Sequence, residues 1–180
     1  MIKESHIQTS LNLDFDAVEK IVLGLLKKQN FEFKGQEIKV NAVEISGLKD
    51  KLVIETDLSG AFDGKMNLIG KPVYNKESQI IQLAQVDIDL RGRNFLSKAI
   101  VFVLGNYIEQ KIIPLLKFSI KNQIEPANEI LQFLPIKFGL FAKAKINELD
   151  IYQIDVLEKT LILHFSLKGN IQLNLESDPT

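Results

Sequence analysis

The stretch Lys51-Leu-Val-Ile-Glu-Thr-Asp-Leu58, continued after a turn by Gly64-Lys-Met-Asn-Leu68, decides the fold class of this chain. Its apolar or β-branched residues recur at every second position, which is the period of a strand with one buried face. Asp63-Gly64 joins the two runs, and Asp-Gly is a strong hairpin signal. The same period extends from Gln36 to Leu90, so the sequence predicts four long antiparallel strands connected by short turns.

Two positions interrupt this strand pattern. Pro72 has no backbone N–H to donate, so its strand is expected to lie at a sheet edge or to be bulged there. Further on, the apolar residues change parity: Ile81 and Leu83 lie on one face, and Val86 and Ile88 lie on the other. A bulge near residues 84–85 would bring both pairs onto the same face.

Helical periodicity flanks the strands. Residues 11–29 carry one apolar stripe and predict a helix, which Asp14 or Asp16 can cap. Residues 94–134 predict a second, much longer helix, kinked where Pro114 and Pro126 each remove a hydrogen bond. Its segment Ala99–Leu104 is apolar on every side and is expected to be enclosed on several sides.

Two further strands are expected after this helix, at residues 138–156 and 160–175. Residues 176–180 read as a polar, disordered tail. No repeat, linker or change in composition divides the chain, so residues 1–175 are expected to form a single α+β domain.

Composition excludes several classes of protein. The 180 residues are 46% hydrophobic and 25% charged, with a net charge of −1 and no cysteine. A disulfide framework, a thiolate metal site and a cysteine nucleophile are therefore absent, and nothing attracts the chain to nucleic acid. No signal peptide or membrane-spanning run is apparent. The chain as given is expected in the cytoplasm, or in the periplasm if it is a fragment of an exported protein.

A catalytic centre is not apparent either. His6 and His164 are the two histidines, and neither has a partner that suggests catalysis or zinc. Asp87 and Asp89 share a strand face with Arg91, which is typical of a charged solvent face. The glycines follow neither the dinucleotide nor the phosphate-loop spacing. We therefore expect no enzyme, no cofactor and no metal.

Residues 58–89 resemble an uncharacterised bacterial family of unknown function, DUF4403, and the best signature is Gly70-Lys71-Pro72-Val73-Tyr74. That family is similar to the tubular lipid-binding superfamily, which includes bactericidal permeability-increasing protein. The resemblance implies a long kinked helix wrapped by a strongly twisted antiparallel sheet, with acyl chains in the seam. Because such proteins are typically longer, the chain is expected to be one repeat or the C-terminal half of a longer protein.

These observations predict a non-catalytic binder of a lipid or another elongated hydrophobic molecule, in a seam between long helix and sheet. The residues expected to line it are Ile100, Val103, Leu104, Tyr107 and Ile108 on the helix and Met66, Leu68, Val86 and Ile88 on the strands. The alternative is a structural or protein-interaction module with a fully packed core and no ligand. Contact with a membrane surface or with a second copy is compatible with either hypothesis. A helix-grip ligand domain ranks below both, because two strands follow the long helix.

Overall fold

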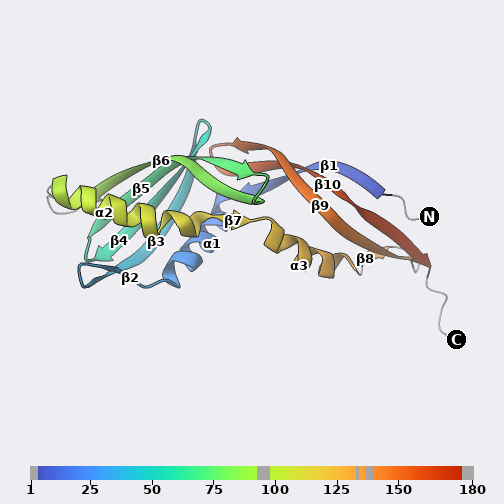
Figure 1. Cartoon of the computed structure of the whole chain (residues 1–180), viewed down its shortest axis with the longest axis horizontal. Coiled ribbons are helices and arrows are strands. Elements are labelled where there is room, and N and C mark those ends of the chain that lie inside the picture. The colour runs from blue at the N-terminus through green and yellow to red at the C-terminus, as the bar shows by residue number, and fades with distance from the viewer. Residues whose placement is uncertain (1–3, 93–97, 133, 137–139, 176–180) are drawn as a thin grey trace.

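The computed structural model describes residues 4–92, 98–132, 134–136 and 140–175. The fold is mostly β, with 59% of the described residues in strands and 26% in helices. Two antiparallel sheets lie one after the other along the long axis of an elongated molecule (Figure 1). The expectation of a tail at residues 176–180 lies outside the described residues.

The first sheet has six strands in the order β2-β3-β4-β5-β6-β7, which is also their order in the sequence. The strands are β2 (Phe31–Phe33), β3 (Gln36–Leu48), β4 (Lys51–Gly60), β5 (Gly64–Asn75), β6 (Ile80–Gly92) and β7 (Phe118–Ser119). The four long members are consecutive antiparallel neighbours. The predicted meander of four strands is therefore confirmed.

Both irregularities of the meander are present. The β5–β6 register shifts where Lys71 pairs with Ala84, and Gln85 in the extra segment has a positive φ of 52°. This confirms the predicted bulge. Pairing between β4 and β5 ends at Gly70, so Pro72 lies on a part of β5 that extends past β4. The missing N–H of Pro72 therefore costs no hydrogen bond to β4.

The second sheet has four strands in the order β1-β10-β9-β8. They are β1 (Glu4–Asp14), β10 (Thr160–Leu175), β9 (Leu140–Val156) and β8 (Leu134–Ile136). The last two long strands were expected, but β1 was not. The predicted helix at residues 11–29 is shorter, because α1 spans Phe15–Lys27 and residues 11–14 pair with β10.

The predicted long kinked helix is the main error of the sequence prediction. The expected α+β class, with a long kinked helix wrapped by the sheet, is wrong for the same reason. The segment instead forms α2 (Lys98–Lys111), a 3-10 turn η1 (Ile113–Leu116), β7 and α3 (Lys121–Leu131). Pro114 ends the α-helical hydrogen bonding. The chain then extends and pairs with β6, and the backbone N–H of Ile120 donates to the Gln79 carbonyl. Pro126 lies inside α3 without ending it.

Helix α2 covers the six-stranded sheet with one face only. Leu104 and Ile108 of α2, and Ile112 directly after it, recur every four residues and are each 1% exposed. Phe102 and Val103, on the other faces, are 70% and 44% exposed. The expectation that the segment Ala99–Leu104 is enclosed on several sides is therefore wrong, because no second layer covers Phe102 and Val103 in the described part of the chain.

Each sheet contains the same succession of a helix, a three-residue strand and a long hairpin. In the first sheet this is α1, β2 and the β3–β4 hairpin, and in the second it is α3, β8 and the β9–β10 hairpin. Each short strand pairs with only the first residues of its long neighbour. Beyond the short strand, side chains of the helix form hydrogen bonds with backbone groups of the long strand. Glu19 accepts from the Ile45 N–H at 2.7 Å, and Asn128 bonds both backbone groups of Ile146, at 2.6 and 2.9 Å.

The two sheets meet where the β3–β4 and β9–β10 hairpins touch. The Gly47 N–H donates to the Glu158 carbonyl at 3.1 Å, and a Cβ at Gly47 would overlap the carbonyl of Leu157. Lys76, in the turn between β5 and β6, forms a second contact between the sheets, an ion pair with Asp150 of β9. Apolar side chains of both sheets belong to one continuous cluster, so the halves share a core at this end.

Candidate functional site

Four of the residues predicted to line a helix–sheet seam are brought together, and their side chains fill it. Met66 and Leu68 on β5 are 0% and 1% exposed and belong to one apolar cluster with Leu104 and Ile108 of α2. Val86 and Ile88 of β6 are partly buried against the same cluster. At these positions the seam is occupied by the side chains themselves.

The remaining helix residues of the predicted seam lie at its margin. Val103 faces outward, and the side chain of Ile100 lies outside the described residues. Tyr107 fastens α2 to β2: its hydroxyl accepts the Glu32 N–H at 3.0 Å, and its ring meets Phe33 edge-on at 5.7 Å. These contacts of Tyr107 therefore hold α2 in position against β2.

The two histidines, His6 and His164, lie on neighbouring strands of the second sheet. His164 is half-buried on the polar face of β10, with Nε2 2.8 Å from a carboxylate oxygen of Asp155. Hydrogen bonds from Gln153 and then from His164 hold the pKa of Asp155 below its usual value. His6 lies on β1 opposite Lys168. Within the described residues, no group of three or more His, Asp or Glu side chains is placed to hold a metal ion.

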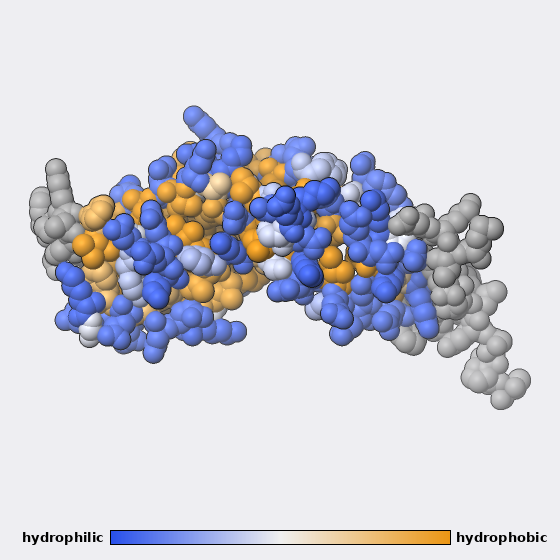
Figure 2. Space-filling view, in the orientation of Figure 1, coloured by the Kyte–Doolittle hydropathy of each residue, from blue (hydrophilic) through white to orange (hydrophobic). Residues whose placement is uncertain are grey.

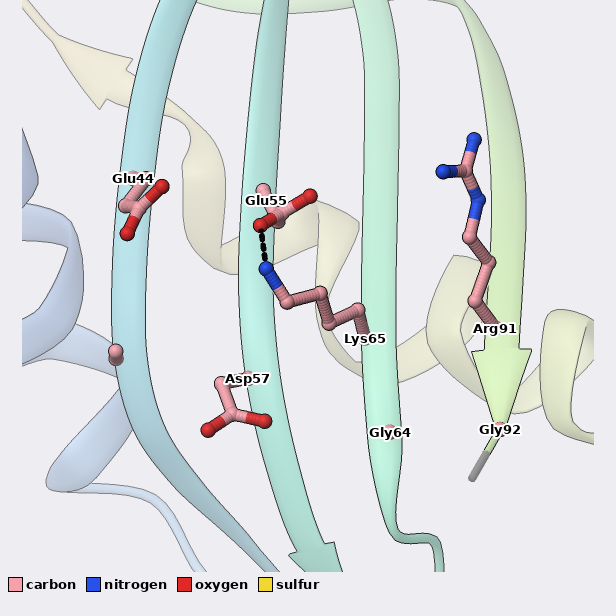
Figure 3. A pocket seen from close by; sticks show the side chains of 8 residues that line it. Glu44, Glu55, Asp57, Gly64, Lys65, Arg91 and Gly92 are labelled. Carbon is pink, nitrogen blue, oxygen red and sulfur yellow. Dashed lines mark hydrogen bonds and ion pairs between the residues drawn. The ribbon is translucent and has the colours of Figure 1, made fainter. Parts of the chain in front are cut away.

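A charged hollow of about 360 Å³ lies on the outer face of the six-stranded sheet (Figure 3). Charged side chains from four neighbouring strands line it, namely Glu44, Glu55, Asp57, Lys65 and Arg91. Gly64 and Gly92, which face each other across β5 and β6, complete the lining of the hollow.

Charges in and beside this hollow neutralise one another. Lys65 forms an ion pair with Glu55, and this hydrogen bond raises the pKa of Lys65 above its usual value. Arg91 donates to Asp89 at 2.8 Å, and Asp87 lies 3.9 Å from Lys51. These groups are solvent-exposed pairs of opposite sign, which water and salt screen. The hollow therefore has the character of a charged outer face.

A smaller hollow of about 150 Å³ lies on the apolar side of the four-stranded sheet, beside α3. Its lining comes from β1, α3, β9 and β10: Ser5, Ile7, Leu131, Ala144, Lys145, Ile146, Leu167, Lys168, Gly169 and Asn170. In the space-filling view, apolar surface is visible between α3 and the strands of this sheet (Figure 2). This is the type of lining that small apolar ligands select.

Apolar residues continue along β1 from this hollow toward the shared core. Ile7 pairs in register with Leu167, and Leu11 pairs with Leu163. Leu163 is buried, whereas Ile7 and Leu11 are each 46% exposed. A row of partly uncovered apolar side chains therefore leads from the hollow to the core.

Sequence reasoning missed this second surface. Ile7, Leu11 and Leu13 share one parity, but Leu11 and Leu13 were placed at the start of a predicted helix, and Ile7 was assigned to no element. Ala144 and Ile146 likewise alternate with lysines within an expected strand. The period-two signal was therefore sufficient to identify the apolar face, although the strands that share it are far apart in the chain.

The fold and surfaces define a class: an antiparallel β protein in which two sheets, each with a covering helix, share one apolar core. The chain belongs to the family described as Domain of unknown function (DUF4403), whose model matches residues 2–175. No curated protein and no solved structure matches the chain. Among the described helices, none has the length and apolarity needed to cross a membrane.

Proposed function

We propose that this protein binds a lipid or another elongated hydrophobic molecule without catalysing a reaction on it. The ligand would lie on the apolar side of the four-stranded sheet, between α3 and β1. This proposal moves the site away from the predicted seam, because Met66, Leu68, Leu104 and Ile108 already fill that seam.

The observation that carries the proposal is the partly uncovered apolar row beside the hollow. Ile7 and Leu11 each leave nearly half of their surface in water, at a cost of about 25 cal/mol per Å² of apolar area that a ligand would recover. A single exposed leucine is ordinary, but a row that runs from a hollow into a core is a typical ligand surface.

The size of the hollow limits the ligand to a narrow molecule. An apolar cavity of about 150 Å³ holds a benzene-sized guest. The hollow would therefore take one end of an alkyl chain, and the rest would follow the row along β1. The resemblance to tubular lipid-binding proteins adds little to this argument, because the described part of the chain contains no long kinked helix.

A matched pair of substitutions tests the site. Ala144→Phe would fill the hollow, whereas Ala42→Phe places the same side chain in the charged hollow of the other sheet. Uptake of a fluorescent C16 fatty acid is the measurement. Filling the space of about two methylenes, at ~0.8 kcal/mol each, should weaken binding by about tenfold in Ala144→Phe. Ala42→Phe should bind as the unsubstituted protein does.

Thermal unfolding of both variants controls for folding. The proposal fails if the unsubstituted protein takes up no fatty acid, or if both variants lose uptake equally while remaining folded. Native mass spectrometry of protein purified from cells provides an independent check, since a bound lipid adds a defined mass.

The second candidate is an interaction module without a ligand. The closed packing around Met66 and Leu104 favours it, since the larger sheet offers no apolar space at those positions. A chain that purifies free of lipid and fails to bind fatty acid, yet self-associates, would support this candidate.

A further inference from the structure

We infer that the free edge of β1 pairs with β1 of a second copy of this chain, joining two four-stranded sheets into one continuous eight-stranded sheet. The two strands would run antiparallel about a two-fold axis at Ser10. This inference does not rest on the proposed ligand, because it uses the backbone edge and side chains of β1 alone.

The edge of β1 is long and exposed. β1 has 11 residues, Glu4–Asp14, and it is the terminal strand of its sheet, the blue strand along the upper edge in Figure 1. Residues 6–12 are all exposed, and within the described strands none pairs with its outer edge. The strand contains no proline, lysine or arginine, the residues by which natural edge strands usually prevent pairing.

The comparison with the first sheet indicates that strands are missing here. The β3–β4 hairpin is continued by β5, β6 and β7, whereas the equivalent β9–β10 hairpin is continued by β1 alone. A second copy at the β1 edge would supply the missing neighbours. Ile7 and Leu11 would then gain side-chain neighbours within the extended sheet.

The sequence of β1 complements itself in one register. In a two-fold antiparallel pair, the sequence numbers of any two facing residues add up to the same value. A sum of 20 gives the best match between facing side chains. Ile7 then faces Leu13 and Thr9 faces Leu11 on the apolar side. Gln8 faces Asn12 on the polar side, and Ser10 faces its own copy. At both ends, His6 faces Asp14 of the other chain, a pairing of opposite charge when the histidine is protonated.

Neighbouring registers are poorer. A sum of 18 would place Glu4 opposite Asp14 at both ends, and like charges directly opposite each other are destabilising. A sum of 22 would pair only residues 8–14 and leave Ile7 without a facing residue. A sum of 16 pairs residues 4–12, but it places Leu11 opposite Ser5 and leaves Leu13 without a facing residue. The register with Ser10 on the axis is therefore the one that pairs Ile7, Leu11 and Leu13 without facing carboxylates.

A cysteine scan tests the register directly, because the chain has no cysteine of its own. Ser10→Cys would place two sulfur atoms in facing positions, where Cα atoms lie ~4.5–5.5 Å apart, within the range of a disulfide. Gln8→Cys would face Asn12, so its own copy would lie four residues away along the strand, ~13 Å off. Under mild oxidation, Ser10→Cys should form a disulfide-linked dimer at least tenfold faster than Gln8→Cys.

Substitutions in the chain without added cysteines test the affinity of dimerisation. Leu11→Lys puts a charge at two symmetric places and should weaken dimerisation by about tenfold or more, measured by sedimentation equilibrium. His6→Asp should weaken it through two facing carboxylate pairs, and the double variant His6→Asp with Asp14→His should restore it. Asp14 caps α1 by position but makes no side-chain capping bond, so its replacement should be tolerated.

The inference is overturned if the chain stays monomeric at ~1 mM, or if Gln8→Cys crosslinks as fast as Ser10→Cys. Failure of the charge-swapped variant to recover dimerisation would overturn the register. None of these outcomes depends on fatty acid uptake, and a loss of uptake in Ala144→Phe would leave them unchanged. The two proposals can therefore fail separately.

Discussion

The two sheets are built on the same plan, yet their apolar faces differ in how completely they are covered. In the first sheet, α1 and α2 lie over long strands, and Met66 and Leu68 are buried. In the second sheet, α3 is the short helix that contacts β9, and Ile7 and Leu11 remain half exposed. The helix, the short strand and the long hairpin are therefore not sufficient to close a core.

The difference lies in what each hairpin receives from the rest of the chain. The first, the β3–β4 hairpin, has the β5–β6 hairpin beside it and α2 above it. The second gains one strand, β1, from the opposite end of the sequence. An apolar face that lacks its second layer is a surface for a ligand or a partner. The proposed ligand lies on that face, and the proposed dimer forms at the β1 edge beside it.

The strongest test of the contrast is the same substitution in both regions. Leu68→Ala removes a side chain that is 1% exposed and should cost about 2–5 kcal/mol in the free energy of unfolding. Leu11→Ala removes one that is 46% exposed and should cost less than about 1 kcal/mol in dilute protein. Urea denaturation measures both. Equal losses would mean that the second sheet is as closed as the first.

The junction between the regions is tested at Gly47. An added Cβ would overlap the Leu157 carbonyl, so Gly47→Ala should destabilise the fold by about 1–3 kcal/mol. Gly24, inside α1, has open space around it. Gly24→Ala should stabilise by about 0.5–1 kcal/mol, because alanine favours a helix over glycine. Thermal unfolding measures whether each substitution lowers or raises stability. If Gly47→Ala left stability unchanged, the two hairpins would not touch.

The smallest expected effect concerns a polar side chain within the closed core. Thr56 is 0% exposed, and its hydroxyl has no hydrogen-bond partner among the described residues. Thr56→Val should therefore raise stability by about 1 kcal/mol, because it removes an unsatisfied buried hydroxyl. Thr9→Val, on the exposed β1, should change it by less than about 0.5 kcal/mol. A loss of stability in Thr56→Val would mean that the hydroxyl is satisfied.

The strands were predictable where the alternation was uninterrupted. Leu52, Ile54, Thr56 and Leu58 define β4, and the change of parity after Leu83 located the bulge at Gln85. The failure was in the helical segment. Apolar residues at helical spacing continue past Pro114, but the pairing of Phe118 with Ile81 of β6 overrides that local preference.

The candidate site was predictable in part. Four of the expected lining residues, Met66, Leu68, Leu104 and Ile108, do meet, because a strand and a helix each bury one periodic face. Whether such a meeting leaves space depends on side-chain volumes at close range, and no periodic pattern reports them. The hollow beside α3 combines Ile7 with Ala144 and Leu167, which the sequence separates by more than a hundred residues.

By itself, the sequence determined the period of the four long strands of the first sheet, the bulge near residues 84–85, the absence of cysteine chemistry and the family. Those properties depend on neighbours a few residues away, where side-chain type and backbone geometry decide. Only the tertiary structure decided which apolar faces are covered, that β1 joins β10, and that the long helical segment breaks. These outcomes depend on the free energy of contacts between segments that are distant in the sequence. The local periodicity of a segment gives no information about those contacts.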